Sequence, residues 1–120
     1  MREILFRGKT YNGEWIYGYC YKVQSLLSPD FKWYIRNDYQ KDNMVIPETI
    51  GQYTGLKDMN GEKIFEGDIL RDYGNDIEDW VVSYEYGGFV GTFDNVCENL
   101  YELHDLEVIG TIHDGGDSSE

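Results

Sequence analysis

Hydrophobic and polar positions alternate along much of the chain with a period of two residues. The clearest run covers residues 14–23. One side of this run carries four aromatic residues and a valine: Trp15, Tyr17, Tyr19, Tyr21 and Val23. A period of two places successive side chains on opposite faces of a β-strand, whereas a helical face repeats about every 3.6 residues. The run therefore predicts a long strand with an aromatic face.

Other short apolar or alternating runs are separated by turn residues such as Asn12-Gly13 and Gly87-Gly88. They predict strands over 2–8, 14–23, 31–36, 49–54, 62–65, 80–86, 89–93 and 106–112, with another beginning at Ile69. Residues 95–104 differ, because Val96, Leu100 and Leu103 recur at helical spacing after a possible cap at 94–95. We therefore expect an all-β protein with at most one short helix.

Turn residues favour a small SH3-like barrel or pseudo-barrel over residues 48–113, preceded by an N-terminal β-hairpin lobe. The expected structural turn residues are Gly55, Gly61, Gly67 and Asp68. The polar loop 37–43 is the expected lobe boundary, which divides a single domain, 1–113, into lobes of about 1–43 and 44–113. The tail 114–120 is acidic and has no apolar anchor, so we expect it to be flexible.

Charge is distributed unevenly along the 120 residues, whose net charge is −13. Residues 1–41 hold seven basic and four acidic side chains, whereas residues 42–120 hold three basic and nineteen acidic ones. Such an acidic field repels phosphate, so we expect no direct nucleic-acid binding. The carboxylates either keep the protein soluble or recognise a basic protein. With no apolar run of about 18 residues and no signal stretch, we expect no membrane partner and a cytoplasmic location.

The densest carboxylate cluster forms a candidate acidic surface. Its members are Asp72, Asp76, Glu78 and Asp79. Their spacing does not match the EF-hand calcium loop, and the chain has no nucleophile elbow, phosphate-binding loop or dinucleotide-binding glycine pattern. We therefore predict no catalytic residues, no cofactor and no metal. A metal-dependent enzyme that uses this acidic loop remains an alternative hypothesis.

The aromatic residues of the long strand are the candidate partner-binding residues: Trp15, Tyr17, Tyr19 and Tyr21. They could also form core, or a platform for stacking bases, although the acidic charge opposes the latter. The chain has 11 tyrosines, more than a small core readily hides, and tyrosine is enriched at protein interfaces. Cys20 and Cys97 match no metal-binding spacing, and we expect them to be buried free thiols.

Three blocks of the sequence resemble the YopX family. They are IPETIGQYTGLKDMNGEKIFEGDIL at 46–70, REILFRGK at 2–9 followed by NGEWIYG at 12–18, and LEVIGTIHD at 106–114. The resemblance implies a small, mainly β protein encoded by temperate phages and prophages, with no established activity and no catalytic motif. One departure is visible after the last block, where the chain reads GGD at 115–117 in place of the family's Asn-Pro-Glu-Leu-like segment.

Three functional hypotheses follow. The first is a phage accessory protein without catalysis, a β module that binds an unknown protein or itself as a homo-oligomer in the bacterial host cytosol. The second is an acidic nucleic-acid mimic that binds a host DNA-binding or defence protein. The third is the metal-dependent enzyme of the acidic loop.

Overall fold

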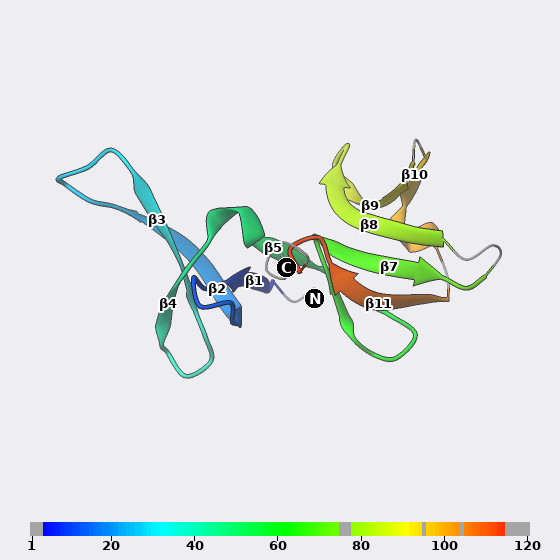
Figure 1. Cartoon of the computed structure of the whole chain (residues 1–120), viewed down its shortest axis with the longest axis horizontal. Coiled ribbons are helices and arrows are strands. Elements are labelled where there is room, and N and C mark those ends of the chain that lie inside the picture. The colour runs from blue at the N-terminus through cyan, green and yellow to red at the C-terminus, as the bar shows by residue number, and fades with distance from the viewer. Residues whose placement is uncertain (1–3, 75–77, 95, 104, 115–120) are drawn as a thin grey trace. The chain divides into compact units, whose positions relative to one another are not determined.

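The computed structural model describes residues 4–74, 78–94, 96–103 and 105–114 (Figure 1). The chain is nearly all β, as predicted. The elements in order are β1 (Phe6–Lys9), β2 (Trp15–Gln24), β3 (Phe31–Arg36), β4 (Asp42–Val45), η1 (Pro47–Thr49), β5 (Gly51–Lys57), β6 (Lys63–Phe65), β7 (Asp68–Asp72), β8 (Glu78–Glu85), β9 (Gly88–Phe93), β10 (Val96–Asn99), η2 (Leu100–Glu102) and β11 (Leu106–Thr111). The two η elements are single turns of 3-10 helix. Within the described residues, no helix has the length and apolar character needed to cross a bilayer.

The chain divides into two compact units, Met1–Tyr53 and Thr54–Glu120. The division falls within β5, and the polar loop that follows β3 instead joins two paired strands of the first unit. The tail that we expected to be flexible lies, from residue 115 onward, outside the described residues.

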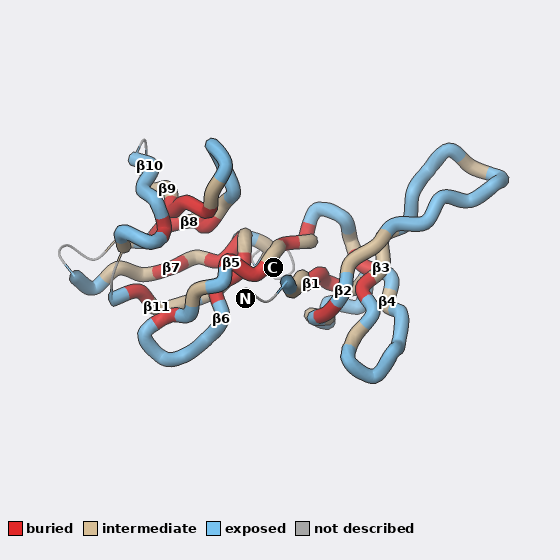
Figure 2. Tube along the Cα trace, turned by 180° about the vertical axis from the view of Figure 1, so that it is seen from behind, coloured by how far each residue is buried: buried red, intermediate tan, exposed pale blue. Residues whose placement is uncertain are grey.

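The first unit is an antiparallel sheet in which β4, β3, β2, β1 and the start of β5 are neighbours. One face holds the core, where Ile35 and Val45 are fully buried. Gly8 lies beneath them, because a Cβ at this position would come within 3.0 Å of both side chains. The strand β2 is longer than its neighbours, so the end of the β2–β3 hairpin extends past β4 and is exposed along both arms (Figures 1 and 2).

The second unit is built on a five-stranded antiparallel sheet in the order β10-β9-β8-β7-β11. Its core consists of seven buried side chains: Ile64, Leu70, Trp80, Val82, Phe89, Leu100 and Leu106. These residues come from six elements, and the buried stretches of β7, β8 and β9 run along the middle of the sheet (Figure 2). The strand β6, which supplies Ile64, is the neighbour of β5.

The sheets stay open in the described residues, so the SH3-like barrel or pseudo-barrel that the turn residues favour is not closed, while the all-β class holds. In the described residues of the second unit, β10 pairs with β9 and β11 pairs with β7, so these two strands form opposite edges of the sheet. A barrel requires its first and last strands to pair. Here the chain leaves β10 through η2, whose Leu100 is buried in the core, and it returns to the sheet on the far side.

The prediction of a helix over 95–104 is wrong. Residues Val96–Asn99 form β10, which pairs with β9 from Val96↔Phe93 to Asn99↔Val90, and only Leu100–Glu102 turn helically. The spacing of the apolar residues favours a helix, but backbone pairing with the exposed edge of β9 stabilises a strand more strongly. The cap also lies later than expected, because the Asn99 side chain accepts a hydrogen bond from the Tyr101 N–H at 2.9 Å.

Candidate functional site

The tyrosine face of the first unit is the face of β2, β3 and β4 opposite the Ile35 core. We define it by six residues: Tyr17, Tyr19, Tyr21, Tyr34, Arg36 and Asp42. Pairing brings them together, because Tyr19 lies opposite Arg36, Tyr21 opposite Tyr34, and Arg36 opposite Asp42. Directly opposed cross-strand residues have their side chains on the same face of the sheet. The six side chains therefore share one face of the sheet, with the tyrosines on β2 and β3 and Asp42 on β4.

Exposure differs along this face. Tyr19 is 69% exposed and Tyr17 is 46% exposed, whereas Tyr21 and Tyr34 are half-buried. The rings of Tyr21 and Tyr34 stack, with centroids 5.6 Å apart and planes 15° apart. Stacked rings restrict each other's rotamers, so the exposed Tyr19 lies next to two ordered side chains.

An ion pair between Arg36 and Asp42 lies at the β4 edge of the tyrosine face. Arg36 donates to both Asp42 carboxylate oxygens, from Nε at 2.8 Å and from Nη2 at 3.2 Å. Hydrogen bonds from Arg36 and then from Tyr21 hold the pKa of Asp42 below its usual value. The Tyr21–Asp42 hydrogen bond correspondingly raises the pKa of Tyr21, whose phenol stays protonated at neutral pH. A shallow pocket of about 210 Å³ lies between Tyr19, Tyr21 and Arg36.

Trp15, the fourth predicted partner-binding residue, is in a different environment. It is half-buried, and the guanidinium of Arg7 lies over its ring, 4.5 Å from the ring centroid. Lys9 also lies over this ring, and both basic side chains are buried. Register explains the grouping, because Lys9 lies opposite Trp15 and Arg7 opposite Tyr17. Of the predicted residues, Tyr19 and Tyr21 thus lie opposite residues of β3, whereas Trp15 and Tyr17 lie opposite residues of β1.

The predicted acidic surface is only partly described, because Asp76 lies outside the described residues. Asp72 lies opposite Glu78 across β7 and β8, and it accepts a hydrogen bond from the Gly74 N–H at 2.7 Å. Asp79 is bound by Arg71 through two hydrogen bonds of 2.8 and 3.1 Å, which lower its pKa. In the described ranges, no three His, Cys, Asp or Glu side chains are grouped so that they could hold a metal ion.

The predicted turn residues occupy three places in the second unit. Gly55, Gly61 and Gly67 all have φ near +90°, a conformation that glycine adopts without a Cβ clash. Gly61 closes the turn between β5 and β6, and Gly67 precedes β7. The buried carboxylate of Asp68 accepts a hydrogen bond from the Phe65 N–H at 2.7 Å, which holds the β6–β7 turn.

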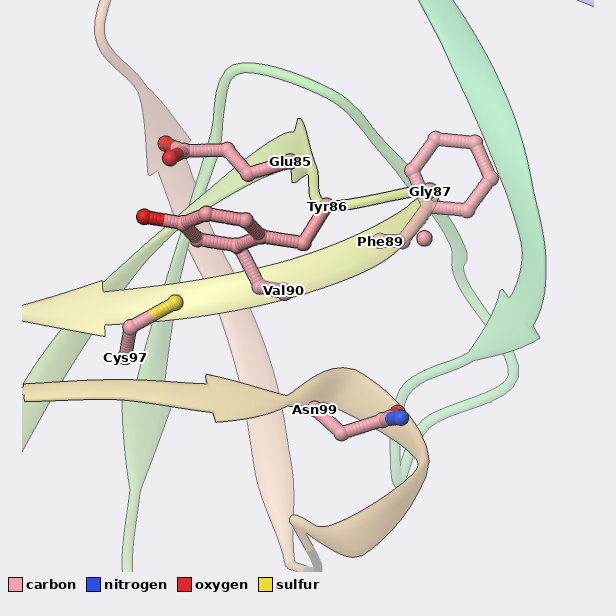
Figure 3. A pocket seen from close by; sticks show the side chains of 8 residues that line it. Glu85, Tyr86, Gly87, Phe89, Val90, Cys97 and Asn99 are labelled. Carbon is pink, nitrogen blue, oxygen red and sulfur yellow. The ribbon is translucent and has the colours of Figure 1, made fainter.

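Two further features were missed by the sequence analysis. Leu26 and Leu27 are fully exposed at the tip of the β2–β3 hairpin. A pocket of about 400 Å³ lies over β9 and β10 in the second unit (Figure 3). Its lining residues are Glu85, Tyr86, Gly87, Gly88, Phe89, Val90, Cys97 and Asn99. Two adjacent leucines within a Ser- and Pro-containing turn were a signal for the first feature, because turns seldom place large apolar residues in water.

Cys97 corrects the expectation that both thiols are buried. It is a free, exposed cysteine in the wall of this pocket, whereas Cys20 is half-buried, and burial raises the pKa of the Cys20 thiol. The reason is the change from helix to edge strand, which leaves all four residues of β10 exposed.

Comparison with known proteins identifies the family but assigns no activity. Protein EF1440 from Enterococcus faecalis has a similar crystal structure, with a TM-score of 0.57, 25% sequence identity and full coverage of both chains. A search of curated proteins found no match. The family model described as YopX protein matches residues 5–117, nearly the whole chain. The chain therefore belongs to the YopX family.

Proposed function

We propose that this chain is a protein-interaction module without catalysis, and that the tyrosine face contacts the partner. The observation that carries the proposal is the exposure of Tyr17 and Tyr19 on a sheet whose opposite face holds the buried Ile35 and Val45. The exposed side of β2 is thus not required to build the core of the unit. Tyrosine and arginine are also the residue types that most often dominate the energy of protein interfaces.

The order of this surface supports the same proposal. Tyr21 stacks on Tyr34, and Arg36 is held by both oxygens of Asp42. A surface that is ordered before binding loses less conformational entropy when a partner arrives. Tyrosine adds to this advantage, because its large contact area is oriented by only two torsion angles.

The partner is a protein rather than a nucleic acid in this proposal. The chain's net charge of −13 repels phosphate. The resemblance to phage and prophage proteins suggests a phage protein or a bacterial host protein in the cytosol. The acidic mimic remains the second candidate, because the 67 residues of the second unit hold 3 basic and 17 acidic side chains, a net charge of −14.

Affinity capture from the lysate of a host that carries the gene tests both candidates. We expect the variant Tyr17→Ala/Tyr19→Ala to lose a partner that the unaltered protein retains at high salt. The matched control is Tyr11→Ala/Tyr39→Ala, which removes two exposed tyrosines from loops outside the tyrosine face. Equal recovery by both variants would exclude the tyrosine face. A DNA-binding protein that is captured by both variants and released by salt would favour the mimic.

A further inference from the structure

The tip of the β2–β3 hairpin is an ordered loop that holds two leucines in water. Leu26 and Leu27 are fully exposed. The Ser25 hydroxyl accepts a hydrogen bond from the Leu27 N–H, and the Ser28 hydroxyl accepts one from the Asp30 N–H, both at 3.1 Å. These hydrogen bonds order the backbone of the loop, and no neighbour among the described residues covers the two leucine side chains.

Positive charge accompanies this apolar tip. Two basic side chains, Lys22 and Lys32, lie on the strands next to the tip, and the segment between them holds a single acidic one, Asp30. The ammonium group of Lys22 lies over the ring of Phe31, 4.3 Å from its centroid, so the charge is fixed close to the tip. A complementary surface must therefore combine an apolar hollow with acidic surroundings.

The pocket over β9 and β10 combines apolar side chains with a carboxylate. Val90 lies opposite Asn99, and Figure 3 shows the side chains of Tyr86, Val90 and Cys97 among those that line the pocket. Glu85 adds a carboxylate to the same pocket. Its volume of about 400 Å³ lies within the range of small-ligand pockets, about 300–1,000 Å³. The surrounding unit has a net charge of −14.

We propose that the leucine tip of one copy of this chain binds in the Tyr86–Cys97 pocket of a second copy. This inference rests on the proposed role as an interaction module, and it uses surfaces outside the tyrosine face. The occupant is a second copy because one chain carries both halves of the contact, an apolar tip with basic flanks and a pocket of mixed lining, with Tyr86, Cys97 and the Glu85 carboxylate, in an acidic unit. The contact joins two different patches, so each copy can bind one neighbour through its tip and another through its pocket.

The natural thiol of Cys97 permits a direct test. In the variant Leu27→Cys/Cys20→Ser, oxidised glutathione should produce disulfide-linked dimers and larger species on a non-reducing gel. The matched control, Tyr39→Cys/Cys20→Ser, places a cysteine at another fully exposed loop position and should cross-link at least about tenfold more slowly. Equal rates for the two variants would overturn the proposal. A disulfide confined to monomers would also overturn it, because the tip would then reach the pocket of its own chain.

Sedimentation of the uncross-linked protein tests the contact without oxidation. Leu26→Ser/Leu27→Ser should weaken self-association by about tenfold or more and leave the melting temperature unchanged, because both side chains are exposed. Cys97→Trp, which fills the pocket, should have the same effect. A mixture of these two variants retains one intact tip and one intact pocket, so it should form a 1:1 dimer that does not grow. Unchanged association of either variant would overturn the proposal.

Two further results separate the alternatives. Tyr17→Ala/Tyr19→Ala should self-associate like the unaltered protein, so failure of the tip contact and failure of the tyrosine face are distinguishable. Anionic vesicles of phosphatidylserine and phosphatidylcholine should not bind the chain. Binding of these vesicles through Leu26 and Leu27, with no self-association, would show that the tip contacts a membrane surface and would overturn the proposal.

Discussion

The carboxylate of Asp58 accepts a hydrogen bond from the backbone N–H of Val108 at 2.9 Å, although the two residues are fifty positions apart. The other oxygen of this carboxylate accepts from the N–H groups of Asn60 and Glu62, at 2.8 and 2.9 Å. One buried side chain thus closes the β5–β6 turn and ties it to β11. This connection joins two segments that are distant in sequence, and it thereby stabilises the second unit.

Asp58 should make the stability of the protein depend on acid. Burial alone would raise its pKa, but hydrogen bonds from four backbone N–H groups hold the pKa below the usual 3.8. A carboxyl group with a lowered folded-state pKa contributes fully above the unfolded-state value, and its contribution is lost as pH falls through the folded-state value. Asp58→Asn should therefore cost about 2 kcal/mol or more at pH 7 and progressively less below pH 3.8.

Urea unfolding of both proteins from pH 7 to pH 2 measures this difference. Asp38→Asn, at an exposed aspartate in the β3–β4 loop, serves as the control and should change stability little. A cost for Asp58→Asn that stays constant across the whole range would contradict the assignment.

Gly18 should tolerate no side chain. A Cβ at this position would lie 2.0 Å from the carbonyl oxygen of Arg36, which belongs to the backbone of β3 and cannot move aside by rotation. Gly18→Ala should therefore force the β2–β3 pairing apart and lower the free energy of unfolding by about 1–3 kcal/mol, as in overpacked cores. Gly88→Ala is the control, because a Cβ there meets open space. Denaturation midpoints that fall equally for the two variants would contradict this explanation.

Tyr86 should be replaceable with a gain in stability. It forms a two-residue hairpin turn with Gly87, in which both residues have positive φ, 55° and 83°. Such turns favour asparagine at the first position, whereas a bulky residue is strained there. Tyr86→Asn should raise the free energy of unfolding by about 1 kcal/mol. The same change at Tyr84, in the strand β8, should lower it, because the edge-on contact with Phe89 is lost.

A strained, 94% exposed tyrosine is consistent with a role in contact rather than in folding. If Tyr86 is kept for the pocket, the stabilised variant should self-associate more weakly than the unaltered protein. Sedimentation of the two proteins at matched concentrations checks this expectation, and urea unfolding measures the stability of the same samples. Unchanged self-association of the variant would show that Tyr86 does not take part in the pocket contact.

Much of the candidate site could be located from the sequence, but its environment could not. The alternation in 14–23 placed Trp15, Tyr17, Tyr19 and Tyr21 on one side of a strand, and the pairings of Tyr19 and Tyr21 with β3 agree with this arrangement. Alternation cannot tell which side is buried, because either face of a strand can be covered. The same pattern therefore left core and partner surface as open alternatives for these residues.

In the 95–104 segment, the local pattern predicted the wrong type of secondary structure. The spacing of Val96, Leu100 and Leu103 suits a helix, and only the exposed edge of β9 made a strand more favourable. The pocket beside Cys97 follows from that pairing, so no local pattern indicated it. Likewise, the turn residues can be recognised in the sequence, but whether the edge strands of the sheet pair with each other cannot. The chain's path through η2 leaves β10 and β11 at opposite edges, so the sheet stays open.

The all-β class, the family and the division of each long strand into two faces can be read from the sequence alone. These properties depend on the period of side chains along a strand and on local turn chemistry, which neighbouring residues specify. Folding establishes which face of β2 is exposed, that residues Val96–Asn99 form the strand β10, and that one chain carries both an exposed leucine tip and a pocket. Burial and pairing depend on segments far apart in sequence, and those segments meet only when the chain folds.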